Sequence, residues 1–165
     1  MRRRRPEPGA AAEADQRTVQ TAAYALLAGR DFSRHELTER LLRKGYGAAV
    51  VEAAVVAIVQ EGFLREERFA EQFVTQRAGR GQGPLRVRMG LRDKGVEPET
   101  IEQALDATET DWVQAAREAR RRKFGLSPPA DYRERAKQAR FLQYRGFSSD
   151  QIRAALGPGD DDPDL

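Results

Sequence analysis

The chain has 165 residues, which is long enough for one domain or a short array of small units. Hydrophobic residues make up 39% of it and charged residues 33%, a balance more typical of a surface-rich helical protein than of an enzyme with a deep interior. The absence of cysteine excludes disulfides and thiolate metal sites. No apolar run approaches the roughly 18 residues that a membrane span needs, and the basic start lacks the apolar stretch of a secretory signal. A cytoplasmic protein is expected.

The two ends of the chain differ from the rest in composition. Residues 1–15 are rich in Arg, Pro, Glu and Ala, and we expect a disordered leader there. Residues 157–165 carry four Asp and no base, and we expect a solvated acidic tail. Between them, apolar residues recur at helical spacing and the breaks fall at Gly and Pro. The sequence therefore predicts an all-α fold.

One pattern of residues occurs three times. It is centred on Gly45, Gly95 and Gly146, which lie 50 and 51 residues apart. Four residues before each glycine is Leu, immediately before it is Lys or Arg, and an apolar residue follows it. A glycine in this context ends a helix in the left-handed conformation, the base favours the negative end of the helix dipole, and the apolar residue folds back onto the last turn. Each copy therefore predicts a helix, a glycine stop and a second helix.

A further helix precedes each of these pairs. The three upstream helices are predicted at Val19 to Leu27, roughly Glu66 to Arg77, and Trp112 to Phe124. Ser33 and Glu36 have the spacing of a capping box at the start of the next helix. Other helix starts are predicted at Pro84, at Pro98, at Pro129 with Asp131, and at Ser148, which has the spacing of a capping box with Gln151.

The expected architecture is three tandem three-helix repeats, at residues 16–62, 63–107 and 108–156. The β-branched residues of 48–59 also suit a strand, but their length, alanines and helical spacing favour a helix. Small helical repeats bury their core by stacking on neighbours, so we expect an elongated, curved array. Such an array presents a long binding surface in place of a deep pocket.

Basic residues are concentrated in the second and third repeats. Residues 117–145 hold ten bases and three acids, and residues 77–94 hold six bases and one acid. This distribution is typical of a surface that binds a polyanion, although solvated helix faces also produce it. We predict that ten residues contact a partner or nucleic acid: Arg80, Arg86, Arg88, Arg120, Arg121, Arg122, Lys123, Arg133, Arg140 and Arg145.

Other candidate features predict structure rather than chemistry. The loop Gly79 to Pro84 lacks the Gly-Lys-Ser/Thr end of a phosphate-binding loop and follows no strand, which favours a flexible connector. His35 is the single histidine and stands two residues after a predicted N-cap, so we expect an exposed first-turn residue, and it has no local partner for metal binding or nucleophilic catalysis. No acid–base pair stands out, and we predict no catalytic residue, metal or cofactor. Four aromatic residues lie among the bases, and we expect most of them in the core and Tyr144 as the exposed ring: Phe124, Tyr132, Phe141 and Tyr144.

Three segments carry a likeness to a known family. They are "DFSRHELTERLLRKGY", "ERFAEQFVTQRAGRGQGPLRVRMGLRDKGV", and "RRRKFG" followed by "RFLQYRGFSSDQI". In these segments, and over roughly residues 18–156, the sequence resembles the RecX family of regulators of the recombinase RecA. The leader and the tail lie outside the family pattern, and Gly90 stands where that pattern has a larger residue.

The resemblance implies a non-enzymatic, all-helical protein that acts in DNA repair and recombination. It implies that the protein binds the RecA filament on single-stranded DNA and inhibits the ATPase and strand-exchange activities of RecA. Direct contact with DNA is a further option under the same resemblance. A monomer without a membrane partner is expected. Two alternatives stay open from the residues: a helix-turn-helix protein that reads DNA with Gln151 and Arg153, and a helical scaffold whose charges serve solubility.

Overall fold

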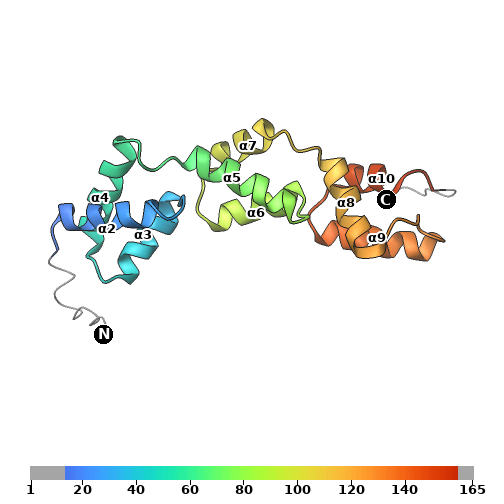
Figure 1. Ribbon diagram of the computed structural model, residues 1–165, viewed down its shortest axis with the longest axis horizontal. Coiled ribbons are helices and arrows are strands. Elements are labelled where there is room, and N and C mark those ends of the chain that lie inside the picture. Colours follow the sequence, from blue (N-terminus) through green and yellow to red (C-terminus); the bar gives the residue numbers. More distant parts are fainter. Residues whose placement is uncertain (1–13, 160–165) are drawn as a thin grey trace. The chain divides into compact units, whose positions relative to one another are not determined.

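The computed structural model describes residues 14–159 (Figure 1). Within this range the chain forms nine α-helices and no β-strand, which confirms the all-α prediction. Residues 1–13 of the predicted leader and 160–165 of the predicted tail lie outside the described residues. The helices are α2 (Gln16–Leu27), α3 (Arg34–Arg43), α4 (Ala48–Gln60), α5 (Glu66–Gly79), α6 (Pro84–Asp93), α7 (Pro98–Ala107), α8 (Trp112–Phe124), α9 (Tyr132–Tyr144) and α10 (Ser149–Leu156).

Contacts between residues divide the chain into two compact units. The first contains α2, α3, α4, the start of α5 through Ala70, and the turn Lys94–Glu97. The second contains α5 from Glu71 onward, α6 as far as Asp93, and the helices α7 to α10. Each unit has its own set of fully buried apolar side chains.

The glycine at the centre of each copy ends a helix as predicted. The backbone angle φ is +95° at Gly45, +71° at Gly95 and +94° at Gly146, all in the left-handed region that favours glycine. The amide of Phe147 donates back to the carbonyl oxygen of Leu142 at 3.2 Å, which closes the last turn of α9. The repeated pattern is therefore a set of left-handed glycine stops.

In the first unit, α2, α3 and α4 pack around aliphatic side chains. Leu37 and Leu41 of α3 and Val51 and Ile58 of α4 are fully buried. Their spacing of four and seven residues places each pair on one face of its helix. Because residues 48–60 form one helix with this buried face, the helical interpretation of its β-branched residues is confirmed.

Equivalent positions form the core of α8, α9 and α10, which lie side by side (Figure 1). Leu142, the counterpart of Leu41, is fully buried, and Ile152, the counterpart of Val51, is 5% exposed. Trp112 is partly buried against the same cluster. The repeat in the sequence is thus a repeat of core positions.

Gly90 of α6 has a packing partner that the sequence did not indicate. The ring of Phe73 on α5 fills the space beside it, and a Cβ at position 90 would lie 2.8 Å from Phe73 Cζ. The volume missing at Gly90 is supplied by Phe73, whose side chain is buried. A larger residue at position 90 would therefore clash with this ring.

The start of α3 holds the turn Lys94–Glu97. Ser33 Oγ accepts the amide of Glu36 at 3.1 Å, as a capping box requires. The Glu36 carboxylate does not return to the cap, because its Oε1 binds Lys94 Nζ at 2.6 Å. Ser33 Oγ also donates to the carbonyl oxygen of Lys94 at 2.7 Å, and Gly95 lies against Cβ of His35. The predicted capping box is thus half correct.

A similar contact occurs in the second unit, at the start of α6. The amide of Gly83 donates to the carbonyl oxygen of Arg145 at 2.8 Å, and the amide of Leu85 donates to that of Gly146 at 3.0 Å. The loop Gly79–Pro84, predicted as a flexible connector, is instead hydrogen-bonded to the turn after α9. The physical reason is that its glycine amide can approach another backbone closely.

These two contacts use equivalent residues. Gly83 stands 50 residues after Ser33, and Arg145 stands 51 residues after Lys94, which are the spacings of the glycine stops. In both units, the start of a middle helix donates a hydrogen bond to the carbonyl of the base that precedes a glycine stop. The stops therefore serve docking as well as helix termination, a role that the local pattern does not reveal.

Candidate polyanion-binding surface

One face of α9 presents exposed cations and an exposed aromatic ring. Arg133, Lys137, Arg140 and Tyr144 follow one another at intervals of three or four residues. At 3.6 residues per turn, this spacing places them on a single face over about 16 Å of helix. All four are exposed, and Tyr144 is 73% exposed. These four residues are called the α9 stripe.

The cations of the α9 stripe have few internal partners. Arg133 and Arg140 make no hydrogen bond or ion pair within residues 14–159. Lys137 Nζ lies 3.9 Å from a carboxylate oxygen of Glu134 and 5.7 Å from the ring centroid of Phe124. An exposed pair at that distance neutralises little charge. The stripe is therefore available to an external anion.

Sequence reasoning did not single out Lys137. The run Arg120–Lys123 is more conspicuous, because its four cations are adjacent. The signal that identifies Lys137 is its spacing of four residues from Arg133 and three from Arg140, within a helix predicted to end at Gly146.

The last turn of α8 adds a second group of exposed cations. Arg121 and Lys123 are exposed and have no hydrogen-bond or ion-pair partner among the described residues. Arg122 is engaged loosely, with NH1 3.3 Å from the carbonyl oxygen of Gly79 and NH2 4.0 Å from the Glu118 carboxylate. Arg121 and Lys123 are the members of this run with free side chains.

Arg120 lies inside the second unit rather than on its surface. Its side chain is 7% exposed, and its Nε donates to Oε1 of Gln138 at 2.7 Å. The guanidinium also donates to the carbonyl oxygen of Ser127. Hydrogen bonds to neutral acceptors satisfy the guanidinium donors, which would otherwise be costly to bury. Arg120 therefore joins α8 to α9 and to the loop between them.

Arg145 and Arg86 hold the turn after α9. Arg145 Nε donates to the carbonyl oxygen of Gly81 at 3.0 Å, and its NH2 donates to that of Arg80. Arg86 NH1 donates to the carbonyl oxygen of Tyr144 at 2.9 Å, and its guanidinium lies 4.9 Å from the centroid of that ring. Both guanidinium groups therefore have hydrogen-bond partners inside the fold, whereas the Arg80 side chain is exposed.

Arg88 is neutralised by Glu102. Its Nε and NH2 donate to the two carboxylate oxygens at 2.6 and 3.0 Å, a bidentate pair. The hydrogen bond from Arg88 holds the pKa of Glu102 below its usual range, and the same bond raises the pKa of Arg88. Arg88 thus offers less charge to a partner than the α9 stripe does.

The aromatic residues among the bases divide equally. Phe124 and Phe141 pack edge to face, with centroids 5.3 Å apart. Tyr144 is exposed as expected, but Tyr132 is also 67% exposed, so the expectation that most of the four are core is wrong. Tyr132 opens α9 directly after its cap Asp131, where no neighbouring helix covers it.

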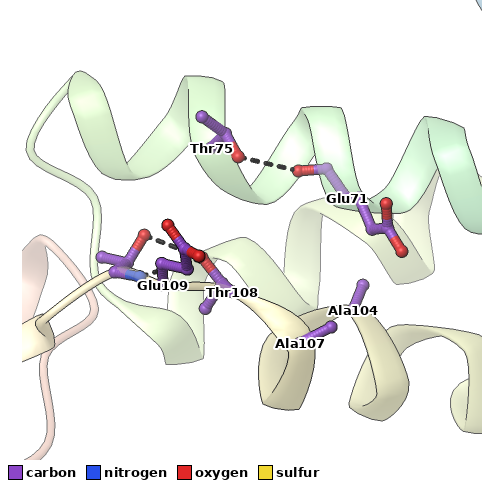
Figure 2. Close-up of a pocket in the computed structure, with 7 residues that line it drawn as sticks. Glu71, Thr75, Ala104, Ala107, Thr108 and Glu109 are labelled. Atoms are coloured by element: carbon purple, nitrogen blue, oxygen red, sulfur yellow. Dashed lines mark hydrogen bonds between the residues drawn. The ribbon is translucent and has the colours of Figure 1, made fainter.

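A pocket of about 490 Å³ in the second unit has the opposite character (Figure 2). Its lining comes from α5, α7 and the segment that follows α7. Glu71 and Glu109 contribute carboxylates, so the pocket repels a polyanion. The remaining lining residues are Thr75, Ala104, Ala107, Thr108 and Thr110.

No group of three or more His, Cys, Asp or Glu in the described part of the chain is arranged to hold a metal ion. His35 is exposed as expected, and its Nε2 lies 3.8 Å from Oε1 of Glu39. None of the described helices is long and apolar enough to cross a membrane.

The residues named for a helix-turn-helix are occupied within α10. The Gln151 side chain accepts the amide of Ser148 at 2.9 Å, completing the capping box predicted there. Arg153 pairs with Asp150. Base readout would require both side chains to leave these partners.

Comparison with protein families accounts for most of the chain. The first, second and third three-helix domains of RecX match residues 21–56, 66–105 and 109–156. The chain belongs to the RecX family. A curated relative, "Regulatory protein RecX" of Halorhodospira halophila, is 47% identical over 156 residues, which is 94% of each chain. The protein of the same name from Pseudomonas savastanoi pv. phaseolicola is 43% identical over 87% of this chain and 94% of its own.

Solved RecX structures share the fold. The crystal structure of RecX from Lactobacillus salivarius has a TM-score of 0.72 and 20% identity, covering 86% of this chain and 94% of that one. A second structure, described as regulatory protein RecX, has the same TM-score and identity over 82% of this chain and 70% of its own. An all-α repeat fold is therefore a property of RecX proteins that this chain shares.

Proposed function

We propose that this RecX-family protein binds the RecA–DNA filament in the bacterial cytoplasm and lowers its ATPase and strand-exchange activities. The proposal assigns it no catalytic role of its own. Its part is to occupy a surface of the filament and thereby to restrain the enzyme that forms it.

The observation that carries the proposal is the α9 stripe. It concentrates three exposed cations on one helix face, two of them without an internal counter-ion in the described residues. Such a surface attracts polyanions and acidic protein surfaces over a distance of about one Debye length. A nucleoprotein filament offers both kinds of surface, repeated along its length.

Ten residues were predicted as contacts, and they contribute to the proposal in different ways. Arg121, Lys123, Arg133 and Arg140 are exposed and have no side-chain partner in the described residues, Lys137 of the α9 stripe joins them, and Arg80 and Arg122 are also exposed. The remaining four act through the fold, because their donors hold other parts of the second unit: Arg86, Arg88, Arg120 and Arg145.

The decisive measurement is the DNA-dependent ATPase of the cognate RecA on single-stranded DNA, with this protein titrated in. We expect inhibition at micromolar concentration or below, and an inhibition constant that rises steeply with salt. RecA alone at each salt concentration corrects for the salt sensitivity of the filament itself. An unchanged ATPase rate at saturating protein would overturn the proposal.

A further inference from the structure

Two large apolar side chains face solvent on α6. Leu85 is 46% exposed and Met89 is 63% exposed. They stand four residues apart and so lie on one face of the helix, on the side opposite the fully buried Val87. In an amphipathic helix, the face turned away from the core normally carries polar side chains. Leu85 and Met89 are called the α6 pair.

The other two repeats have no such pair at the equivalent positions. Counted back ten and six residues from the glycine stops, the counterparts are His35 and Glu39 of α3, and Ala136 and Arg140 of α9. The His35 and Glu39 side chains are 55% and 48% exposed, so the fold accepts polar residues there. The repeat therefore does not require large apolar side chains on this face, and the α6 pair needs another explanation.

The α6 pair adjoins the aromatic end of the α9 stripe. Arg86 follows Leu85 directly and stands three residues before Met89. Its guanidinium lies 4.9 Å from the ring centroid of Tyr144, and its NH1 donates to the carbonyl oxygen of that residue. The amide of Leu85 donates to the carbonyl oxygen of Gly146 at 3.0 Å. Since α6 and α9 both belong to the second unit, the apolar face of one helix continues into the cations of the other.

Cations also flank the α6 pair on its own helix. Arg92 is exposed and stands three residues after Met89, on the same face. Arg86 lies on the other side of Met89, and the one acid of α6 is its last residue, Asp93. A partner that covers the α6 pair and the α9 stripe together must therefore offer apolar side chains next to carboxylates.

The aliphatic character of the α6 pair favours a protein over a nucleic acid as this partner. Single-stranded nucleic acid is held by cations and by flat aromatic rings on which its bases stack. Tyr144 meets that description, but Leu85 and Met89 present no flat ring. Met adapts its shape to apolar partner side chains, and two contacts four residues apart match the spacing with which an amphipathic helix is bound.

We propose that the α6 pair and Tyr144 form a docking surface for an acidic amphipathic helix of the recombinase. Its apolar side chains cover Leu85 and Met89, and its carboxylates reach the α9 stripe. The identity of the partner as the recombinase rests on the proposed function, whereas its acidic amphipathic character follows from the surface. The apolar contact contributes affinity that salt does not screen, in contrast to the cations.

The binding test is the variant Leu85→Gln with Met89→Gln, here called the Gln variant. Gln has a similar length and helix propensity, and an unchanged urea midpoint checks the fold. Biolayer interferometry measures binding of the full chain to RecA filaments on immobilised single-stranded DNA, with bare DNA in parallel. We expect at least tenfold weaker binding to filaments and less than a twofold change on bare DNA. The matched control is Leu42→Gln with Val59→Gln, two exposed apolar residues of the first unit, and should change filament binding less than twofold.

Salt gives a second measurement that does not depend on comparing folds. At about 0.5 M salt the Debye length is about 4 Å, so the cations of the α9 stripe are largely screened. The wild type should keep a weaker but measurable affinity for filaments under these conditions, and the Gln variant should have none. Complete loss of wild-type binding at this salt concentration would overturn the apolar contact.

Three further results would also overturn the docking proposal. Equal filament binding by the Gln variant and the wild type would mean that the α6 pair is not contacted. Equal weakening on filaments and on bare DNA would identify nucleic acid as what touches it. A wild-type dimer that the Gln substitutions dissociate, measured by analytical ultracentrifugation, would identify a second copy of the chain as the occupant.

ATPase measurements with the same proteins separate this proposal from the proposed function. If the wild type binds filaments through the α6 pair but leaves the RecA ATPase unchanged, the docking surface stands and the proposed function is wrong. If the wild type and the Gln variant bind and inhibit equally, the proposed function stands and the docking surface is wrong. A wild type that does not bind filaments would overturn both.

Discussion

α3 and α9 occupy the same place in their repeats but carry opposite charge. Counted from the glycine stops, Glu36 and Glu39 of α3 correspond to Lys137 and Arg140 of α9. The Glu36 side chain is 14% exposed and binds Lys94 of a docked turn. The Lys137 side chain is 63% exposed and has only a loose partner. One position therefore serves docking in the first repeat and faces solvent in the third.

The middle helix of the second repeat shows that docking does not require an acid. Its residue at this position is Arg86, which donates to the carbonyl oxygen of Tyr144, the last residue of α9 before the turn. Glu36 and Arg86 differ in charge, yet both hold a turn, while Lys137 has none above it among the described residues. The repeat thus sets where a side chain lies, and the presence of a docked turn decides whether its charge is available.

The largest expected effect comes from Gly83→Ala, which separates the start of α6 from the turn after α9. A Cβ at position 83 would lie 2.4 Å from backbone atoms of Gly146 and Phe147, so the two backbones must separate. We expect a loss of about 3 kcal/mol, at the upper end of overpacking effects, measured as a lower urea midpoint by circular dichroism. Gly79→Ala is the control, because a Cβ there meets no atom within 4 Å. Equal midpoints for the two variants would contradict the docking geometry.

The next effect concerns function and transfers the charges of α3 to α9. Lys137→Glu with Arg140→Glu should weaken inhibition of the RecA ATPase at least tenfold, about 1.4 kcal/mol, because the stripe then repels an anionic partner. The control is Arg17→Glu with Arg40→Glu, two exposed cations of the first unit with no side-chain ion pair in the described residues. Equal loss in both variants would show that only net charge matters.

Local patterns predicted the helices and their ends well. Glycine stops, prolines in the first turn and Ser or Asp caps act within a few residues, so their effects are readable from adjacent positions. The boundaries of α8 agree with the sequence at both ends, Trp112 and Phe124. Buried apolar residues recur at the same distance from each glycine stop, so the repeat also indicates which positions belong to the core.

Contacts between distant residues were not predictable in the same way. Glu36 was assigned to a cap three residues away, but its partner Lys94 is 58 residues distant. Arg120 is indistinguishable from its basic neighbours in the sequence, and only the packing of α9 turns it toward Gln138. A single sequence records residue types, whereas these roles depend on which elements meet.

A smaller effect is expected from Glu36→Gln, which removes the ion pair between α3 and Lys94 of the turn that packs against it. Burial opposes ionisation of Glu36, but the hydrogen bond and charge of Lys94, with help from Arg30, outweigh it and lower its pKa. Because the pKa of Glu36 is lower in the folded than in the unfolded protein, its ionised form stabilises the fold at pH values above the unfolded pKa, near 4.5. This stabilisation is lost as the pH falls through the folded-state pKa.

The variant should therefore be about 1 kcal/mol less stable than the wild type at pH 7. The difference should shrink when urea denaturation is repeated at pH values below 4.5. Glu39→Gln is the control, since that side chain is 48% exposed and pairs within its own helix. A pH-independent difference would mean that Glu36 acts through packing rather than charge.

The smallest effect is expected from Glu102→Gln, which breaks the bidentate pair with Arg88. Its hydrogen bonds are as short as those of Glu36, but the Glu102 side chain is 51% exposed, so water replaces most of what is lost. We expect a change of at most about 0.5 kcal/mol in urea denaturation, and none in high salt. A loss as large as that of Glu36→Gln would show that pairing geometry, rather than burial within a docked turn, determines what an ion pair contributes in this fold.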